Sequence, residues 1–313
     1  MTNREPQLPD HDLDRVRDAF QLDHVDSVVY LTHGLMNRNW QIITTNGRYA
    51  LKQLLDIPVT TARRNLRVLT ALHEGGVPVC PPLLTRDSDP VIEVGTRAYC
   101  LLPWLDGEHP NGPDLTRTQA QDLGATIGKL HQRLNQLDPS IGLPAITGAP
   151  TARTVQPEQA IAEARRFQTA AHAAGGSFDT TVIDLLDQRI ALIDKHAHSR
   201  PTDNLPKGPY GWTHGDLQHR NIIWTGPTIG AVIDWDRIRV RPFAEEIART
   251  ATIQFATANG LDLERVCAFV AGYRTIIRID DADLADGVHR LWWKRMSDFW
   301  LLRTRKLIMR ACS

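Results

Sequence analysis

Hydrophobic positions along the chain change their spacing several times, and each change marks an expected element. In residues 11–20 the apolar side chains recur at helical spacing, which predicts an amphipathic helix with Asp10 as its N-cap. The next apolar runs are short and contain many β-branched and aromatic residues, a pattern typical of strands. We expect these strands at 28–31, 40–43, 49–54, 91–94 and 97–102.

One longer helix interrupts the strands. The segment from Thr60 to Glu74 carries leucines at a spacing of three and stops at Gly75-Gly76, a pair typical of helix ends. Asn46-Gly47, between the second and third strands, predicts a two-residue hairpin turn. We therefore expect the first hundred residues to form a small β-rich unit with one inserted helix.

Proline and glycine gather between residues 103 and 113, which indicates a domain boundary. Helical patterns dominate after it, at 115–136, 156–174, 179–198 and from 242 to the end. A hairpin interrupts them, with strands at 221–224 and 229–233 and a turn at Gly226-Pro227. The predicted fold class is α+β, with a β-rich N-lobe at 1–105, a hinge at about 100–107 and a mainly helical C-lobe at 106–313.

Length and charge narrow the classes of function. The 313 residues contain 36 Lys plus Arg and 36 Asp plus Glu, so no excess of positive charge indicates a nucleic-acid partner. No apolar run approaches the roughly 18 residues of a membrane span, and no leader is apparent, so we expect a cytoplasmic protein without a membrane partner. The four cysteines form no CxxC pair, which argues against a zinc ribbon or a redox dithiol.

Charge is nevertheless uneven along the C-lobe. The segment 290–310 carries seven basic residues and one acidic residue, and its aromatic spacing predicts an amphipathic helix packed on the C-lobe. A dimer face, a nucleic-acid patch or a membrane-surface helix are the alternatives for this segment. An acidic cluster at 280–286 precedes it, with helix capping as the expected role and binding of a polyamine as the alternative.

The densest polar segment is Thr213–Asn221, which is followed by Ile233-Asp234-Trp235-Asp236. Phosphoryl transfer from ATP needs one carboxylate to orient the attacking hydroxyl, an amide oxygen and a second carboxylate for Mg²⁺, and a lysine. Mg²⁺ keeps several waters, so one Asn and one Asp are a sufficient protein contribution. Asp216, Asn221 and Asp234 supply these types in the required order, beside apolar runs that would hold them in place.

The motif His214-Gly-Asp216-x4-Asn221, with Ile233-Asp234-Trp-Asp236 after it, resembles the aminoglycoside phosphotransferase/choline kinase superfamily. These are small-molecule relatives of protein kinases. The resemblance covers most of the chain, because further landmarks arrive in order: the phosphate-covering turn at 33–40, the strand lysine in 49–52, the hinge at 101–107, the first C-lobe helix at 123–131 and Glu246-Ile247-Ala248 in place of Asp-Leu-Ala. It implies a bilobal protein-kinase-like fold and ATP-dependent phosphorylation of a small molecule.

The resemblance also implies roles for single residues. Asp216 would orient or deprotonate the acceptor hydroxyl, and Asn221 and Asp234 would bind Mg²⁺. The nucleotide, ATP with GTP left open, would be bound by Lys52, Gly34, Asn37, Leu102 and Trp104. Supporting roles fall to His214 (a buried brace of the loop), Asp236 (support of the metal site), Glu246, His219 and Arg220. The acceptor candidates are Arg239, Arg241, Glu245, Asp280, Asp281 and Asp283.

Two positions depart from the pattern of protein kinases. Those enzymes pair the strand lysine with a helix glutamate, but here Asn65 occupies that place, so Lys52 lacks this partner or finds one elsewhere. The phosphate turn has one clear glycine, Gly34, rather than a glycine-rich loop. We interpret Asn65 as subfamily drift rather than loss of activity, and a single-glycine turn is common in the small-molecule branch.

Alternatives remain at this stage. His214, Asp216 and His219 have residue types and spacing that suit Zn²⁺ or Mn²⁺ in a hydrolase, and Asn65 is compatible with an inactive nucleotide-binding protein. For an active kinase, the leading acceptor is an aminoglycoside-like antibiotic or a related hydroxylated metabolite. An aminoglycoside would make the protein a resistance enzyme and would favour an acidic pocket. Homoserine, choline or a sugar is the alternative acceptor, and we expect a monomer or a homodimer.

Overall fold

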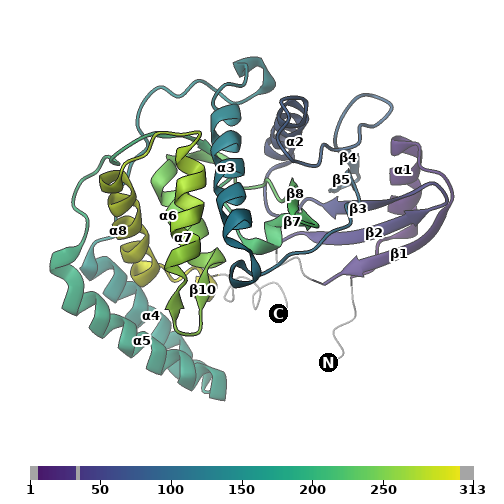
Figure 1. Cartoon of the computed structure of the whole chain (residues 1–313). Helices are drawn as coiled ribbons and strands as arrows, with labels where there is room; N and C mark the ends of the chain where they lie inside the picture. Colours follow the sequence, from purple (N-terminus) through teal and green to yellow (C-terminus); the bar gives the residue numbers. More distant parts are fainter. Residues whose placement is uncertain (1–5, 33–35, 304–313) are drawn as a thin grey trace. The chain divides into compact units, whose positions relative to one another are not determined.

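The structure is a computed structural model that describes residues 6–32 and 36–303 (Figure 1). The chain divides into two compact units, and each is assembled from separate stretches. Unit 1 is formed by Met1–Thr147, Gly211–Arg241 and Thr250–Arg278, and unit 2 by Gly148–Tyr210, Pro242–Arg249 and Ile279–Ser313. The lobe boundary that we predict near residue 105 lies inside unit 1 and stays a prediction.

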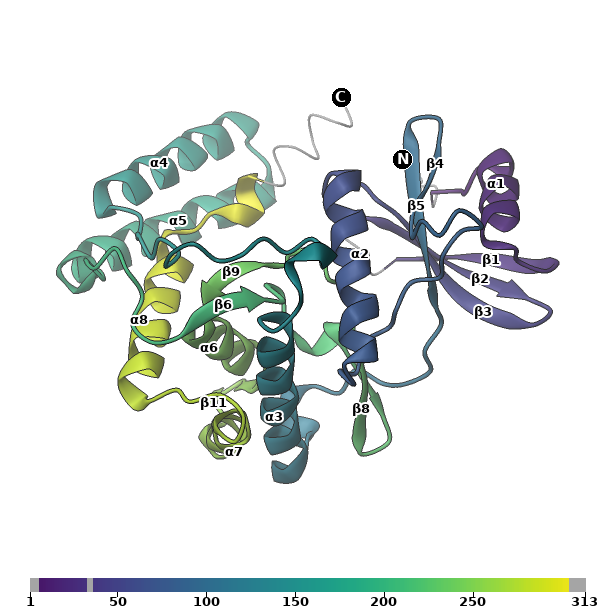
Figure 2. The ribbon, with the colours of Figure 1, turned by 90° about the horizontal axis from the view of Figure 1, so that it is seen from above.

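A five-stranded antiparallel sheet opens unit 1, in the order β1-β2-β3-β5-β4 (Figures 1 and 2). The five predicted strands are confirmed within three residues as β1 Val25–Leu31, β2 Arg38–Thr44, β3 Gly47–Gln53, β4 Ile92–Val94 and β5 Arg97–Pro103. The predicted turn was wrong by one position, because Thr44 pairs with Gly47 and leaves Thr45 and Asn46 as the turn. The Thr44 hydroxyl accepts from the Asn46 N–H and donates to the Gly47 carbonyl, which closes the turn there.

Each face of the sheet is covered by one helix. Helix α1 (Asp10–Phe20) contributes to the core that contains Leu51 and Leu101, and α2 (Val59–Glu74) contributes to the core that contains Cys100. Side chains alternate along a strand, so Lys52 lies on the opposite face from Leu51, toward α2. The strand period thereby sets the side of the sheet on which the candidate lysine acts.

Helix α1 begins at Asp10, one position earlier than predicted. Pro9 occupies the N-cap position in an extended conformation, and its carbonyl accepts the N–H groups of Asp12 and Leu13. No side-chain cap bond forms, so the expected capping role of Asp10 is wrong. Asp10 instead lies in the first turn, where a negative charge complements the helix dipole.

The Asp12 side chain ties α1 to the sheet. It is fully buried and accepts hydrogen bonds from the Arg97 guanidinium, with Nη2 at 2.8 Å, and from the Tyr99 hydroxyl. Replacing Asp12 by Asn is therefore expected to lower the free energy of unfolding at pH 7 by roughly 2–4 kcal/mol. Chemical denaturation of the two proteins measures this difference.

The same pair predicts a dependence on pH. The hydrogen bond and charge of Arg97 hold the pKa of the Asp12 carboxyl below its ordinary value of 3.8. Its stabilisation is fully present above that value and is lost as the pH falls through the lower folded-state pKa. The difference between wild type and Asp12→Asn should therefore shrink in acid, and a constant difference down to about pH 3 would contradict this role.

Two helices form the second part of unit 1. Helices α3 (Arg117–Leu134) and α7 (Leu263–Arg274) cross so closely that a Cβ at Gly124 would lie 1.9 Å from the Phe269 carbonyl oxygen. The hairpin of β7 (Ile222–Thr225) and β8 (Thr228–Val232) is confirmed, with Gly226-Pro227 as its turn. Helix α6 (Phe243–Gln254) has residues in both units.

Several short elements escaped prediction. They are β6 Tyr210–Thr213, β9 Arg239–Pro242, β10 Ala256–Thr257, β11 Gly260–Leu261 and the 3₁₀ turns η1 Gly112–Asp114, η2 Pro139–Ile141, η3 Ala197–Ser199 and η4 His219–Asn221. Each has two to four residues, which is too short for a hydrophobic period to show. Strand β6 pairs with β9, and the catalytic-loop motif follows β6 directly.

Unit 2 contains the helices α4 (Pro157–Ala174), α5 (Ser177–His196) and α8 (Asp281–Ser297), which share one apolar core. Asp280 caps α8 as predicted, and it forms a reciprocal capping box with Asp283. The prediction of one continuous helix through 290–310 is wrong, because α8 ends at Ser297 and Asp298 is extended. Residues 300–303 are helical again, and residues 304–310 lie outside the described part.

One basic residue of the segment 290–310 is buried. Arg290 is 4% exposed and donates to Asp286 and to the carbonyls of Ala152, Asp203 and Leu205. Its positive charge therefore ties unit 2 together instead of adding to a surface patch. Within the residues that the structure describes, no helix is both long and apolar enough to span a membrane.

Candidate active site

The catalytic-loop motif is held in place by a buried imidazole. His214 is fully buried, and its Nδ1 accepts the Asp216 N–H at 3.2 Å. Nε2 must then carry the proton, and it donates to the Ile233 carbonyl at 3.0 Å. His214 thereby links the loop that carries Asp216 to the segment that carries Asp234, which is the bracing role expected from the sequence.

Gly215 allows the loop and the Asp234 segment to approach each other. Its φ is +87°, in the left-handed region that favours glycine, and a Cβ there would lie 2.1 Å from the Arg237 carbonyl oxygen. The same close contact places Trp235 against the His214 ring, with centroids 4.5 Å apart. A larger residue at Gly215 would push the two segments apart.

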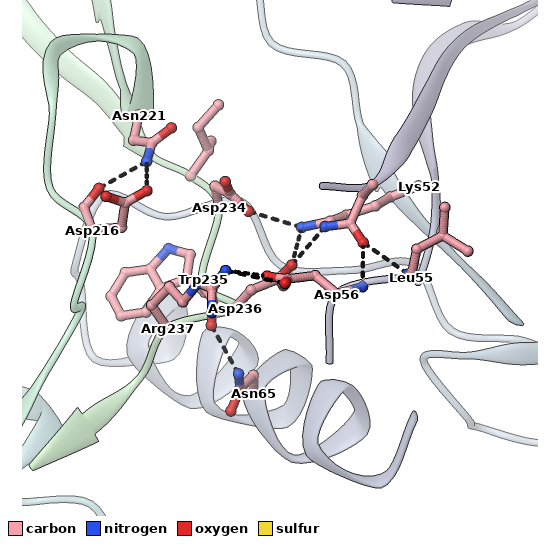
Figure 3. A network of polar contacts seen from close by, with 12 residues as sticks. Lys52, Leu55, Asp56, Asn65, Asp216, Asn221, Asp234, Trp235, Asp236 and Arg237 are labelled. Carbon is pink, nitrogen blue, oxygen red and sulfur yellow. Dashed lines mark hydrogen bonds and ion pairs between the residues drawn. The ribbon is translucent and has the colours of Figure 1, made fainter. Parts of the chain in front are cut away.

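Asp216 and Asn221 contact each other at the polar site drawn in Figure 3. The turn η4 brings the Asn221 Nδ2 to 2.8 Å from the Asp216 backbone carbonyl and 3.4 Å from its Oδ2. Because Nδ2 is the donor in these contacts, the Asn221 Oδ1 remains an acceptor for another group. A neutral oxygen next to a carboxylate suits a hard cation such as Mg²⁺.

Lys52 belongs to a separate set of contacts, in which it bridges two carboxylates. Its Nζ lies 2.8 Å from Asp234 Oδ1 and 2.8 Å from Asp236 Oδ2 (Figure 3). Burial by itself would lower the pKa of the Lys52 ammonium, but the two carboxylates more than offset it, and the pKa is raised. Burial by itself would raise the pKa of the Asp234 carboxyl. The charge and hydrogen bond of Lys52 outweigh burial, so this pKa is lowered. Lys52 is therefore a firmly protonated cation between two anions.

The backbone between the two carboxylates is irregular. Asp234 and Asp236 both contact the Lys52 ammonium, whereas the Trp235 ring packs against His214. Asp234 has a φ of +63°, an uncommon value for a residue other than glycine. Such strain at a polar site is typical of functional segments.

Three polar contacts fix this segment from other elements. Asn37 donates from Nδ2 to Asp236 Oδ2 at 2.8 Å, and Asn65 of α2 donates to the Trp235 carbonyl at 2.8 Å. Arg237 forms an ion pair at 2.7 Å with Asp56, which lies in the loop after β3. Asn65 occupies the place of the helix glutamate, so α2 contacts the backbone of this segment instead of the lysine.

The expected nucleotide residues are distributed around Lys52. Leu102 lines a small cavity beside Lys52, together with Cys80, Cys100 and residues of α2 and the segment 233–236. Its volume is about 50 Å³, room for one or two waters, so it is a packing void and not a nucleotide-sized site. Burial raises the pKa of Cys80 to about 11 and of Cys100 to about 12, which keeps both thiols neutral.

The remaining nucleotide candidates differ in what the structure shows. The Trp104 N–H donates to the Arg48 carbonyl at 3.0 Å and thus extends the sheet, which leaves its carbonyl and ring for other contacts. Asn37 is 9% exposed and uses its amide within the protein. Gly34 lies outside the described residues. All three stay predictions as nucleotide contacts.

A second hollow adjoins the catalytic loop at His219. It has a volume of about 300 Å³ and is lined by Asn111, Gly112, Pro113, Asp114, His219, Ile253, Gln254 and Ala256. Burial and the charges of Arg220 and His109 lower the pKa of His219, so its imidazole is neutral near pH 7. Asp114 is the one acidic residue of this lining. Arg220 itself is exposed.

The other acceptor candidates have protein contacts of their own. In unit 2, Asp280 and Asp283 form the capping box of α8, and Glu245 pairs with Lys294 at 2.6 Å. Glu246 is 2% exposed in α6. Arg239 and Arg241 belong to β9, and Asp281 lies in the first turn of α8. Glu246 stays a prediction as a supporting residue, and the others stay predictions as ligands of an acceptor.

The donor set fits Mg²⁺ and a nucleotide better than it fits a hydrolytic metal. In the part of the chain that the structure describes, no group of three His, Cys, Asp or Glu side chains is arranged to hold a metal ion. Both ring nitrogens of His214 already contact the backbone. By contrast, the Asn221 and Asp234 oxygens are ligands that Mg²⁺ prefers, and Lys52 adds a cation for phosphate.

Sequence reasoning missed two parts of the site. The Asn37 side chain holds Asp236 and the loop after β3, a contact that the sequence did not suggest, and its role toward the nucleotide stays a prediction. Asp56 received no role, although it anchors Arg237. The Asp234-Trp235-Asp236 sequence was the available signal, since two carboxylates so close together in the chain need neutralising partners.

Comparisons with known proteins agree with this geometry. Residues 27–276 match the model of the phosphotransferase enzyme family. Homoserine kinase of Pseudomonas aeruginosa is 27% identical over 273 residues, which covers 85% of this chain and 74% of that protein. Homoserine kinase of Methylobacillus flagellatus is 22% identical over 285 residues, covering 88% and 81%.

Solved structures confirm the α+β, kinase-like fold. Amicoumacin kinase, solved with AMP-PNP and Ca²⁺, superposes with a TM-score of 0.63 at 18% identity, covering 91% of this chain and 83% of that one. Spectinomycin phosphotransferase with ADP and spectinomycin gives a TM-score of 0.63 at 16% identity, covering 93% and 87%. The chain therefore belongs to the phosphotransferase enzyme family and is an ATP-dependent kinase of small molecules.

Proposed function

We propose that the protein transfers the γ-phosphate of ATP to the hydroxyl of a small amino alcohol of the homoserine type. The single observation that carries this proposal is the similarity to homoserine kinases, which extends over 85% of the chain. The similar antibiotic kinases share at most 18% of their residues with this chain, which supports the common fold and no particular acceptor. The order of the two acceptor classes that the sequence suggested is thereby reversed.

The charge around the catalytic loop supports the same acceptor class. The hollow at His219 contains one carboxylate, from Asp114, and a neutral imidazole. A polycationic aminoglycoside would favour several carboxylates, whereas homoserine carries one ammonium group and one carboxylate and has no net charge. The volume of about 300 Å³ is also at the lower end of ligand sites. We propose this hollow as the place of the acceptor.

The proposed chemistry asks the protein mainly for positioning. Asp216 would hydrogen-bond the acceptor hydroxyl and orient it for in-line attack, and Lys52 would balance charge on the phosphates. Asn221 and Asp234 would hold Mg²⁺, which supplies further neutralisation of the phosphate charge when bound. Little covalent chemistry is required, so geometry and preorganised charge provide the rate.

A phosphotransfer screen tests the acceptor. We expect kcat/KM for homoserine or a similar amino alcohol to exceed that for aminoglycosides by roughly 100-fold or more, because a pocket built for one ammonium cannot satisfy several. ADP release, measured with homoserine, other amino alcohols, choline, sugars and antibiotics as acceptors, gives the ranking. Preferred turnover of an aminoglycoside would overturn the proposed acceptor and leave the kinase class intact.

A substitution in the hollow tests the location. Ile253→Trp would fill part of the space beside His219, and we expect it to raise KM for the acceptor while KM for ATP stays near wild type. The matched control is Leu263→Trp, at a side chain that is 66% exposed on α7. An unchanged acceptor KM in Ile253→Trp would place the acceptor elsewhere.

A further inference from the structure

The two carboxylates that pair with Lys52 are in different surroundings. The Asp234 side chain is 46% exposed, whereas Asp236 and Lys52 are each 13% exposed. Asp234 therefore presents a free edge to solvent and can turn to another cation. Asp236 is largely buried beside the Lys52 ammonium. If Asp236 lost this contact, its negative charge would lie in the interior without a counter-charge.

Asn37 holds Asp236 in this orientation. The Asn37 Oδ1 accepts two backbone N–H groups, from Leu55 at 2.8 Å and from Asp56 at 3.1 Å. Since those donors require the oxygen on their side, Nδ2 must face Asp236, and it donates to Oδ2 at 2.8 Å. The same Oδ2 contacts Lys52, so one oxygen receives both a neutral and a charged donor.

Helix α2 cannot supply the carboxylate that protein kinases use for this lysine. From Val59 to His73 it contains no acidic residue, and Glu74 is its last residue. Asn65, which is 2% exposed, instead donates to the Trp235 carbonyl, while its Oδ1 accepts from Arg64. The helix thus fixes the backbone between the two aspartates, and the carboxylate for Lys52 comes from that same segment.

We propose that Asp236 is the lasting partner of Lys52 and replaces the helix glutamate of protein kinases, while Asp234 exchanges Lys52 for Mg²⁺ when nucleotide binds. Asp236 is a positioning residue in this scheme, because it acts through the lysine and not on the substrate. The inference rests on the proposed function, in which Lys52 meets the phosphates. It differs from the sequence-based expectation, in which Asp236 supports the metal.

Nucleotide binding without metal separates the two roles. Titration calorimetry with ATP in EDTA, and then with Mg²⁺, would compare wild type with Asp236→Asn and Asp234→Asn. We expect Asp236→Asn to weaken binding of metal-free ATP by roughly 10-fold or more, since the ammonium loses the contact that orients it. Asp234→Asn should bind metal-free ATP about as well as wild type and lose the enhancement by Mg²⁺.

One control variant and one further test variant accompany these titrations. Glu93→Gln removes a carboxylate that is 54% exposed and paired with Arg63, and it should bind ATP like wild type. If Asp236→Asn fails to fold in a thermal melt, Asn37→Ala tests the same link without changing charge, and it should weaken metal-free binding in the same direction. A variant at Asp236 or Asn37 that bound metal-free ATP normally would overturn the inference.

The same titrations distinguish this inference from the proposed function. Wild-type protein that bound no ATP would overturn both. Wild-type protein that bound ATP, with an Asp236→Asn variant that lost only the enhancement by Mg²⁺, would make Asp236 a metal ligand and leave the kinase function standing. The result turns on the metal dependence of binding and not on turnover.

Discussion

Asp216→Asn is expected to lower kcat by roughly 10²- to 10⁴-fold while ATP affinity stays near that of wild type. The substitution keeps the shape of the side chain and removes its charge, so the acceptor hydroxyl loses the group that orients or deprotonates it. The backbone contacts of Asp216 with His214 and Asn221 remain, because they use its N–H and carbonyl groups. Steady-state kinetics and nucleotide titration on the same preparation measure both quantities.

A matched control is Glu264→Gln, which makes the same chemical change at an exposed position of α7. It should leave kcat unchanged. Near-normal turnover of Asp216→Asn would contradict the assignment of Asp216. A loss of both turnover and ATP binding would instead indicate that the loop had lost its structure.

Asp234→Ala is expected to weaken binding of Mg²⁺-nucleotide by roughly 10- to 100-fold and to reduce kcat as well. One Asp234 oxygen contacts Lys52, and the half-exposed carboxylate has a second oxygen for a cation. Lys52 keeps Asp236 as its partner in this variant, so the segment should remain folded. Titration of the variant with Mg²⁺ at fixed ATP, followed by kinetics at saturating Mg²⁺, checks the prediction.

One result would contradict the role of Asp234 as a metal ligand. Unchanged affinity for Mg²⁺-nucleotide would remove Asp234 from the metal site. Partial recovery of the rate at high Mg²⁺ would support the role, because added metal compensates for a weakened site by mass action. A thermal melt of the variant without ligand shows whether the substitution acts on binding or on folding.

The fold was predictable wherever an element was long enough to show a period. The helix from Thr60 to Glu74 and the strands around Trp40 and Leu51 were placed within three residues, because alternation and helical spacing are local properties. Strands β6 and β9 were missed, since four residues contain too little pattern. The end of α8 at Asp298 was missed because the aromatic spacing continues past it.

The candidate site was predictable as a set of residue types and not as a set of contacts. The motif around Asp216 and Asn221 closes on itself within five residues, so its sequence spacing already implied proximity. Lys52 and Asp234 are 182 residues apart, and only the pairing of distant segments brings them to 2.8 Å. Sequence alignment at Asn65 showed that a glutamate was missing and could not show what replaced it.

The sequence by itself determined the class of this protein. Its periods specify a β-rich part followed by helices, because alternation and helical spacing depend on neighbours within a few residues. Its polar residue types indicate phosphoryl transfer, and their resemblance to a known superfamily indicates a small-molecule acceptor. Only the tertiary structure decided that Asp236 faces Lys52, that Asn37 braces Asp236 and that Asn65 holds the Trp235 carbonyl. Those contacts join the residue before β2, strand β3, helix α2 and the segment after β8, and their geometry follows from how the elements pack rather than from any local spacing.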